Sequence, residues 1–379
     1  MKRVNRIAAA GLLGVAALAG CGQKPSEPAA GGADAVAAEE KVLNVYNWSD
    51  YIDPAVIEDF QKETGIAVSY DVFDSNEVLE TKLLTGNSGY DVVVPSAYFL
   101  ERQIQAGVFR KLDRARLPNL ANLDPGLQAR VAVHDPGNEH SVIYMWGTTV
   151  IGYDVAKVAA IMPDAPTDSW DLVFDPAVIS RFKDCGVSLL DDPTDMVATA
   201  LLWLGKDPNS QSEADLQLAE DALLAIRPYI RTIHSSQYIE DLANGEICIA
   251  VGYSGDMLQA RDRAEEAGTG VEVSFTIPQE GALMWFDTLA IPADARHPGN
   301  AHAFIDYLLR PEVAAANSNY VNYATANAAA MALVNEELRN DPGIFPTPEV
   351  KERLQPNHAK SAEFTRLLNR SWTKFMTGR

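Results

Sequence analysis

The sequence predicts an α/β fold made of two lobes, and three observations support this prediction. The chain has 379 residues, whereas a single domain usually has ~100–200. Strand-like and helix-like segments alternate from residue 43 to residue 107, as in a parallel, doubly wound sheet. The same alternation recurs after residue 188, so we expect a second unit of the same class.

The first alternation begins with the apolar strand Leu43–Asn47. Asp53 and Pro54 then predict the start of a helix, because aspartate caps a helix N-terminus and proline suits the first helical position. Gly65 is expected to end this helix as a left-handed cap. Its inner face is predicted to consist of Val56, Ile57 and Phe60.

Two further strand–helix pairs complete the first alternation. The β-branched run Ile66–Val72 predicts a strand, and the leucine stripe of Ser75–Leu84 predicts the helix that follows it. Asp91–Val94 is too apolar for the edge of a sheet and predicts an internal strand. The next helix is expected over Ala97–Ala106, up to Gly107. This βαβαβ order favours a parallel sheet.

The second alternation is more widely spaced. Strands are predicted at Ser188–Leu190 and Ile247–Gly252, each followed by a helix, at Met196–Leu204 and Met257–Ala267. Two further strands are expected to flank a glycine-containing turn, at Phe275–Pro278 and Thr288–Pro292. The rest of the chain reads as mostly helical, starting with the amphipathic segment Ala301–Leu309.

The first forty residues predict an export signal and a tether. Basic residues precede the apolar run Ile7–Ala19, which is too short to span a membrane comfortably. The run ends in Leu-Ala-Gly-Cys, which resembles the lipobox of bacterial lipoproteins. The resemblance implies a signal peptide at 1–20, lipidation of Cys21 and stable anchoring by several acyl chains. The stretch that follows is rich in Ala, Gly, Pro and small polar residues and predicts a flexible tether at 21–41. Plain secretion is the alternative.

The two remaining cysteines are Cys185 and Cys248. An exported protein meets oxidising conditions, under which disulfides persist. A bond between these cysteines would close a loop of roughly 60 residues and stabilise the fold by about 4 kcal/mol in the chain-entropy description. The alternative is a pair of buried free thiols.

The composition excludes several classes of function. Asp and Glu total 52 against 31 Lys and Arg, a formal net charge of −21. This charge argues against binding to nucleic acid or to anionic lipid surfaces, and it is compatible with a cationic ligand. Acidity that only aids solubility is the alternative. The chain contains no cysteine-rich metal motif, no His-Glu-x-x-His, no Walker loop and no dinucleotide fingerprint, so we expect no metal, no cofactor and no enzyme.

Aromatic and acidic residues follow the predicted strands. Ligands of open α/β sheets bind at the carboxyl ends of the strands. Aromatic faces attract an organic ammonium by about 0.5–2 kcal/mol, and carboxylates accept its hydrogen bonds. The residues at these ends are Trp48, Ser49, Asp50, Tyr51, Pro95, Ser96, Tyr98, Asp191, Asp192, Thr194, Asp195, Tyr253, Asp256, Trp285, Phe286, Asp287, Tyr320 and Tyr323. Each alone could be a core residue or a helix cap, but together they predict a site for an organic cation.

Five segments resemble the putrescine/spermidine-binding proteins of bacterial ABC transporters. They are Asn47–Ile52, Val94–Ser96, Leu204–Ser210, His234–Tyr238 and Asp241–Gly245. The resemblance extends over residues 42–379. It implies a periplasmic-binding-protein fold whose two lobes close on a polyamine like a flytrap. It also implies delivery to an ABC permease by a periplasmic monomer that contacts the membrane only through its lipid anchor.

The resemblance also implies the boundaries of the lobes. We expect lobe 1 to comprise 42–146 and 276–324, and lobe 2 to comprise 147–275 and 325–379. The chain is expected to cross between the lobes near Met145–Thr149, Phe275–Pro278 and Tyr323–Asn327.

The resemblance assigns most of the ligand contacts. The cage is expected to be formed by Trp48, Ser49, Asp50, Tyr51, Ser96, Asp195, Tyr253, Asp256, Trp285, Asp287 and Tyr323. Two positions depart from the family pattern, because Tyr253 stands where tryptophan is common and Asp195 where glutamate is common. Both departures keep the chemistry and change the reach of the side chain.

Three residues favour spermidine over putrescine as the ligand. Asp192 lies three residues before Asp195 and could meet a third amine. Trp285 offers a large stacking face, and Tyr98 adds a ring and a hydroxyl near Ser96. In the alternative, Asp192 is a solvated loop charge and Trp285 only fills the core.

Two other functions stay open at this point. The same flytrap could present a polyamine to a membrane receptor as a sensor subunit, which partner capture would distinguish from transport. Paired carboxylates could also serve a secreted hydrolase. Tight binding without turnover would exclude the hydrolase.

Overall fold

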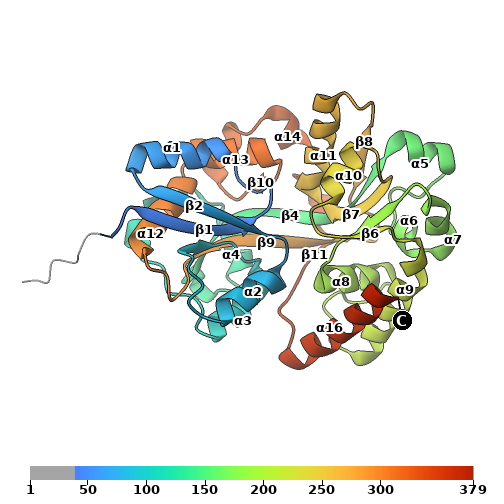
Figure 1. The fold of residues 1–379 in the computed structure, drawn as a ribbon, viewed down its shortest axis with the longest axis horizontal. Helices are drawn as coiled ribbons and strands as arrows, with labels where there is room; N and C mark the ends of the chain where they lie inside the picture. The colour runs from blue at the N-terminus through green and yellow to red at the C-terminus, as the bar shows by residue number, and fades with distance from the viewer. Residues whose placement is uncertain (1–38, 379) are drawn as a thin grey trace, which may run out of the picture. The chain divides into compact units, whose positions relative to one another are not determined.

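The structure, a computed structural model, describes residues 39–378 (Figure 1). The predicted signal peptide, Cys21 and most of the predicted tether lie outside the described residues. The described end of the tether is held in place, because the Glu39 carboxylate accepts hydrogen bonds from the backbone N–H groups of Gly299 (2.9 Å) and Asn300 (3.0 Å). Among the described residues, no helix has both the length and the apolar character needed to cross a membrane.

The longest strand, β4 (Ser141–Asp154), connects the two parts of the sheet. Its first half pairs antiparallel with β9 (Ala282–Ala290), and its second half pairs antiparallel with β7 (Ile249–Tyr253). The strand order is β2-β1-β3-β9-β4-β7-β5-β6. Three short strands pair at the sides, β8 and β10 with β4, and β11 with β9. The sheet is therefore continuous through β4.

Parallel pairs flank this centre on both sides. β1 lies between β2 and β3, and β5 lies between β6 and β7, all in parallel. The remaining strands are β1 (Val42–Trp48), β2 (Ala67–Phe73), β3 (Val92–Val93), β5 (Val187–Leu189), β6 (Thr232–Ile233), β8 (Val273–Thr276), β10 (Ala324–Thr325) and β11 (Leu354–Pro356). Because parallel strands share a direction, their carboxyl ends gather at one edge on each side of β4.

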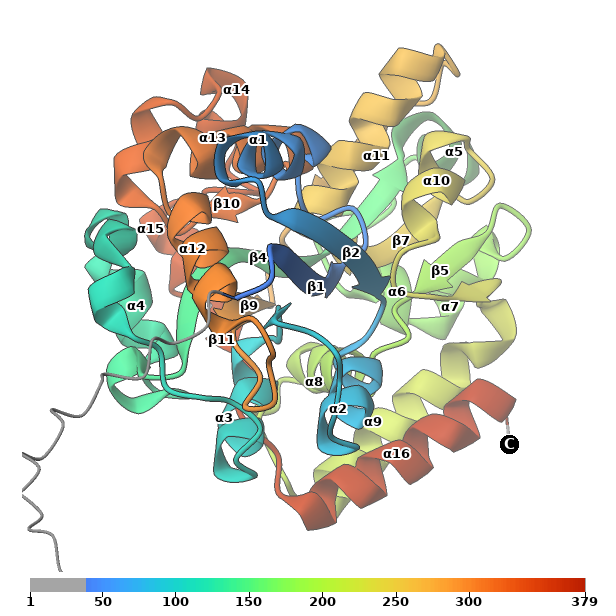
Figure 2. The ribbon, with the colours of Figure 1, turned by 60° about the vertical axis from the view of Figure 1, so that its left-hand side comes forward.

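Helices cover both faces of the sheet, with α1 and α13 on one face and α2 and α3 on the other (Figures 1 and 2). In the first half of the chain the helices are α1 (Pro54–Thr64), α2 (Asn76–Leu84), α3 (Ala97–Gln105), α4 (Pro125–Val131), α5 (Val155–Ile161), α6 (Asp171–Phe174), α7 (Pro176–Ile179) and α8 (Pro193–Trp203). In the second half they are α9 (Glu213–Ile226), α10 (Tyr238–Ala243), α11 (Ser254–Ala267), α12 (Pro298–Leu308), α13 (Pro311–Val321), α14 (Glu336–Asn340), α15 (Pro348–Lys351) and α16 (Ala362–Thr377).

Two large hydrophobic cores lie on the two sides of the β4 midpoint, accompanied by two smaller apolar clusters. The first takes its buried residues almost entirely from 43–146 and 282–354, and the second from 150–273 and 364–375. The chain passes between the cores within β4, between β8 and β9, and between β11 and α16. The last passage differs from the expected one at Tyr323–Asn327, because apolar residues such as Val334 and Ile344 after that point pack into the first core.

The predicted caps of the first two helices are present. The Asp53 carboxylate accepts from the Ala55 N–H at 2.9 Å, and Gly65 has a φ of 68° at the end of α1. Val56 and Phe60 are buried beneath α1, as predicted. The leucine stripe of α2 is narrower than predicted, since Leu84 is 56 % exposed. β3 is internal, between β1 and β9, as its apolar sequence predicts.

The prediction around residues 275–292 is wrong. β8 and β9 do not form a hairpin, since both pair with β4, and Ala282–Asp287 belongs to a strand instead of a turn. All nine residues of β9 are buried, so its sequence lacks the alternation that marks a half-exposed strand. β4, in which every residue except Tyr153 is buried, was expected only as a crossing point. The helices α8 and α11 also begin three residues before their predicted starts, which places Asp195 and Asp256 in first helical turns.

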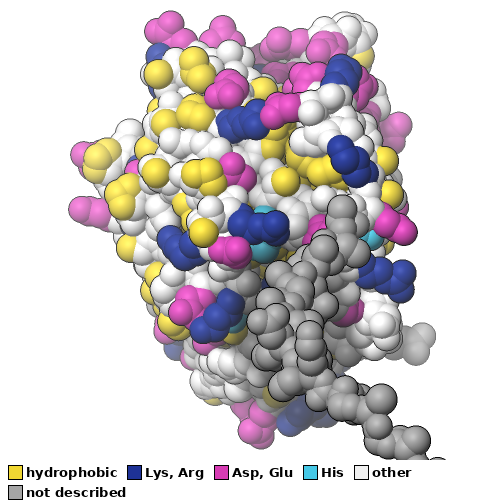
Figure 3. All heavy atoms as spheres, turned by 90° about the vertical axis from the view of Figure 1, so that its left-hand side faces the viewer, with side chains coloured by type: hydrophobic (Ala, Val, Ile, Leu, Met, Phe, Trp, Pro, Cys, Tyr) yellow, Lys and Arg dark blue, Asp and Glu magenta, His cyan; other side chains and the backbone are white. Residues whose placement is uncertain are grey.

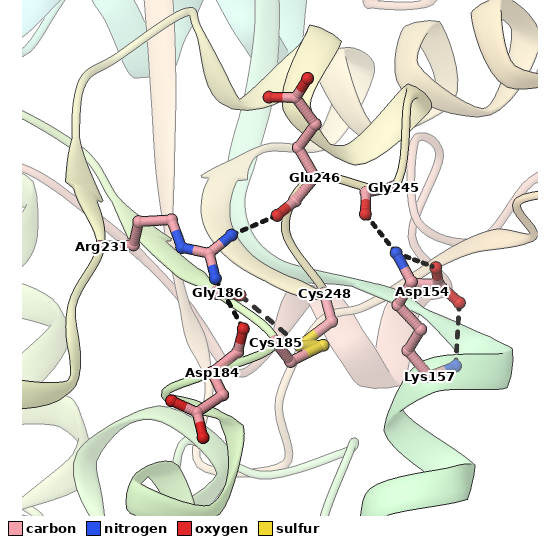
Figure 4. The surroundings of a disulfide bond; sticks show 9 residues. All are labelled: Asp154, Lys157, Asp184, Cys185, Gly186, Arg231, Gly245, Glu246 and Cys248. Carbon is pink, nitrogen blue, oxygen red and sulfur yellow. Dashed lines mark hydrogen bonds and ion pairs between the residues drawn. A yellow bond between two sulfur atoms is a disulfide. The ribbon is translucent and has the colours of Figure 1, made fainter.

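A disulfide joins Cys185 to Cys248, the pair predicted from the sequence, with their Cα atoms 5.7 Å apart (Figure 4). It lies just before β5 and β7, at the amino ends of these two adjacent strands. The Arg231 guanidinium beside it donates hydrogen bonds to the carbonyl oxygens of Asp184 (2.7 Å) and Glu246. The bond therefore fixes the end of the second core that lies opposite the carboxyl ends of the strands.

The end of the molecule at α1 and α12 faces the viewer in Figure 3. On its visible part, acidic, basic and apolar side chains are interspersed. Binding to a polyanion requires a continuous basic surface, and this visible face does not offer one.

Candidate ligand-binding site

The carboxyl ends of strands from both sides of β4 border one cleft. The cleft contains about 560 Å³ of empty space, including the part that is open to solvent. Its walls are mainly aromatic and acidic. The lining residues are Trp48, Ser49, Tyr51, Phe73, Asp74, Asn76, Ser96, Tyr98, Asp195, Ser235, Ser236, Ile239, Tyr253, Asp256, Trp285, Asp287 and Tyr323.

Three buried carboxylates dominate the chemistry of the cleft. The side chains of Asp195, Asp256 and Asp287 come from α8, α11 and β9, and the residues are 2 %, 8 % and 5 % exposed. Among the described residues, none of the three forms an ion pair with Lys, Arg or His. Buried carboxylates are usually paired with a positive charge. In their ionised forms, these three carboxylates thus have no cationic partner in the cleft.

Neutral donors hold each carboxylate in place. The Ser96 hydroxyl donates to Asp287 at 2.6 Å. The hydroxyls of Tyr238 and Tyr323 donate to the two oxygens of Asp256. Asp195 accepts from the Thr149 hydroxyl (3.0 Å) and from the Asn357 amide (2.6 Å). These bonds fix the carboxylates without neutralising them.

Burial shifts the titration of all three carboxyls upward. Burial raises the pKa of Asp256 to about 6 and that of Asp287 to about 7, although hydroxyl donors favour the ionised forms. Burial also raises the pKa of Asp195 well above its usual range, and the charge of the nearby Asp192 raises it further. Loss of solvation disfavours the ionised form, whereas a cation beside it would favour that form.

Aromatic rings form the apolar part of the wall. The ring centroid of Trp285 lies 5.5 Å from that of Tyr253 and 5.5 Å from that of Tyr323. Tyr51 meets Tyr323 edge-on at 5.0 Å. Glycine is required behind this wall, because a Cβ atom at Gly255 would lie 2.6 Å from the Tyr323 ring. Such a wall can stack on methylene chains and attract ammonium groups.

The structure brings all but two of the predicted ligand contacts into this cleft. Asp50 does not line it; its carboxylate is partly exposed and pairs with Arg263 at 2.8 Å. Asp192 does not line it either; the residue is 3 % exposed and its Oδ1 accepts from the Asp195 N–H at 2.9 Å, which caps α8. Asp192 is therefore neither a solvated loop charge nor a direct part of the wall.

The other predicted strand-end residues lie elsewhere. Asp191 accepts from the Trp372 indole at 2.9 Å, and Phe286 packs into the first core. Tyr320 is 56 % exposed on α13. Pro95 and Thr194 are buried beside the cleft without lining it.

The sequence analysis missed two groups of lining residues. Phe73 ends β2, and Asp74 and Asn76 follow it, so the rule that ligands bind at strand ends would have found them if applied to that strand. Ser235, Ser236 and Ile239 follow β6, a two-residue strand that is too short to recognise from sequence.

Within the described residues, no cluster of three or more His, Cys, Asp or Glu side chains is arranged to hold a metal ion.

Comparisons with known proteins identify the family of this chain. The family model for bacterial extracellular solute-binding proteins matches residues 55–347. The putrescine-binding periplasmic protein PotF of Escherichia coli is 54 % identical over 346 residues, which cover 91 % of this chain and 94 % of that protein.

Two solved structures show the same fold. The spermidine/putrescine ABC transporter substrate-binding protein PotD of Streptococcus pneumoniae has a TM-score of 0.72 at 29 % identity, covering 89 % of this chain and 99 % of that chain. The TpPotD lipoprotein of Treponema pallidum also has a TM-score of 0.72, at 27 % identity and with 88 % and 99 % coverage. These matches confirm the predicted two-lobed fold, and the relatives are named as binding proteins, as expected for a protein that is not an enzyme. The chain belongs to the family of bacterial extracellular solute-binding proteins.

Proposed function

We propose that this protein captures a linear polyamine between its two lobes in the periplasm and delivers it, as a monomer, to an ABC permease. The observation that carries the proposal is the set of three buried carboxylates without a cationic partner among the described residues. A polyamine supplies several ammonium groups separated by methylenes, which suits carboxylates set among aromatic rings. The names of the relatives support the same class of ligand.

The cleft lies where the lobes would close on the ligand. An ion pair also joins the two sides of the cleft, because Arg263 of α11 contacts Asp50, which follows β1. Arg263 also contacts Glu240 of α10. A ligand that touches both walls favours the closed arrangement by its differential affinity for it. The two cores support a division into lobes at the β4 midpoint, at 277–281 and at 357–361.

Titration calorimetry with putrescine and spermidine tests the proposal. We expect tight binding of at least one of them, with the amine recovered unchanged, because the relatives are named as binding proteins. Absence of binding to any linear amine would refute the proposal. Consumption of the amine would favour the hydrolase instead. Capture of a receptor in place of a permease would favour a sensor subunit.

We further propose that spermidine binds better than putrescine, with Asp192 acting from behind the cleft wall. Tyr98 lines the cleft, and its hydroxyl lies beside the Asp192 carboxyl, whose pKa burial raises to about 6. The ionised Asp192 carboxylate behind Tyr98 would therefore attract a third amine that lies near Tyr98. Trp285, 7 % exposed, provides the large stacking face expected for a longer ligand.

Replacing Asp192 by asparagine separates its charge from its capping role. Asparagine caps helices as well as aspartate, so Asp192→Asn should leave α8 intact. We expect spermidine affinity to fall by about 1–3 kcal/mol, while putrescine affinity stays nearly unchanged. Calorimetry with both amines measures this difference, and thermal unfolding checks that the cap is kept. Equal losses for the two amines, or a wild-type preference for putrescine, would contradict the role of Asp192.

We also propose that Cys21 anchors the protein to a membrane by lipidation. The support is the Leu-Ala-Gly-Cys sequence and the naming of one structural relative as a lipoprotein. Cys21→Ser should move the full-length protein from the membrane fraction to the soluble fraction of the expressing cells. A soluble wild-type protein, or an unchanged distribution, would count against the anchor.

A further inference from the structure

Asp74 gathers hydroxyl groups from both sides of the cleft. The Ser49 hydroxyl, after β1, donates to Asp74 Oδ1 at 2.9 Å. The Ser236 hydroxyl, before α10, lies 3.4 Å from the same oxygen. All three residues line the cleft, and Asp74 lies at its exposed rim. One carboxylate oxygen therefore accepts a hydrogen bond from one hydroxyl on each side of the cleft.

The hydrogen-bond partners decide where the Ser236 proton points. Its hydroxyl is also 3.4 Å from Nδ1 of His234. That nitrogen already accepts from the backbone N–H groups of Ser236 and Gln237, each at 3.1 Å. Asp74 forms no ion pair with a basic side chain among the described residues. The carboxylate is thus the better acceptor, since charge-assisted hydrogen bonds are the stronger ones.

A hydroxyl whose proton is committed to Asp74 can only accept further hydrogen bonds. Ser49 and Ser236 then present oxygen lone pairs to the cleft, and Asp74 adds a negative charge beside them. An ammonium group finds acceptors there. A carboxylate gains no hydrogen bond from these two hydroxyls and is repelled by the charge of Asp74.

We propose that Asp74 is a positioning residue that orients the hydroxyls of Ser49 and Ser236. The cleft then prefers amines that carry no carboxylate next to the ammonium group. The inference rests on the proposed function and adds a rule of specificity to it. The favoured ligands are decarboxylated diamines and polyamines. Diamino acids of the same chain length, which carry a carboxylate beside one ammonium, are rejected at the rim of the cleft.

The test compares putrescine with ornithine by calorimetry on the wild-type protein and two variants. Asp74→Ala frees both serine hydroxyls and removes the charge, so the ratio of putrescine to ornithine affinity should fall by about tenfold or more. Asp74→Asn keeps an acceptor for the hydroxyls but removes the charge, so its ratio should lie between those of the wild type and Asp74→Ala. Asp71→Ala is the matched control, because Asp71 lies on β2 three residues before Asp74, is exposed and does not line the cleft.

A fourth variant tests the coupling through the serine. Ser49→Ala removes one of the two oxygen acceptors that Asp74 orients, so it should lower the same ratio by less than Asp74→Ala does. The effects of the two changes should not add fully, because the two residues share one hydrogen bond. If Asp74→Ala binds putrescine and keeps the full preference over ornithine, the inference is overturned while the proposed function stands. If the wild-type protein binds neither putrescine nor spermidine, the proposed function fails and the inference with it.

Discussion

Asp256→Asn is expected to remove most of the polyamine affinity. The substitution keeps the size of the side chain and deletes one of the three unpaired charges of the cleft. Loss of one partner leaves a buried ammonium group unpaired, which costs about 2–5 kcal/mol and corresponds to a loss of about 30-fold or more. Calorimetry at neutral pH with the preferred amine measures the change.

The control for Asp256→Asn is Glu266→Gln, an equal change of charge at an exposed position of the same helix. The control should bind like the wild type. Folding of Asp256→Asn should be intact, because removing a buried charge relieves an unfavourable burial. A loss of tenfold or less in a folded Asp256→Asn protein would show that Asp256 does not pair with the ligand.

Acid is expected to weaken binding by at least 100-fold between pH 8 and pH 4. In the ligand-free protein, burial raises the pKa of Asp256 to about 6 and that of Asp287 to about 7. A bound ammonium lowers both values, because it favours the ionised carboxylate. Below about pH 7 these groups are protonated in the ligand-free protein, so they must release their protons when the ligand binds. Each such group can therefore lower the affinity by up to tenfold per pH unit.

The stability of the ligand-free protein should change in the opposite direction. A carboxyl whose folded-state pKa is raised stabilises the fold when it is protonated, and this stabilisation is lost as the pH rises through that pKa. These two groups should therefore make the ligand-free protein more stable near pH 5 than near pH 8. Calorimetric affinity and thermal unfolding over pH 4–8 measure the two trends. Affinity that is constant over this range would refute the carboxylate cage.

Local rules predicted the parts of the fold in which capping and periodicity carry the information. Asp53 and Gly65 mark the ends of α1, and the rule of strand ends located Trp48, Asp256 and most of the cleft. β9 was missed because all its residues are buried, so neither face of the strand is marked by polar residues.

The contacts that depend on tertiary structure could not be predicted from local sequence. Asp192 looks like a loop charge in the sequence, yet it is a buried helix cap, since its neighbour Pro193 starts α8 earlier than the periodicity suggests. Asp74 and Ser236 lie 162 residues apart and meet only when the two sides of the cleft approach each other.

The place of β9 in the sheet has a consequence for how the chain folds. β9 lies between β3 and β4, so it must return from residue 282 to pair with segments made much earlier in the chain. No continuous fragment before β9 can therefore complete the first core, whereas most of the second core comes from the single stretch 150–273. Pairings over such long separations are slow to form, because the entropy of closing the intervening loop opposes them. The side of the binding site that belongs to the second core can thus fold before the side that belongs to the first core, although each side contributes carboxylates to the finished cleft.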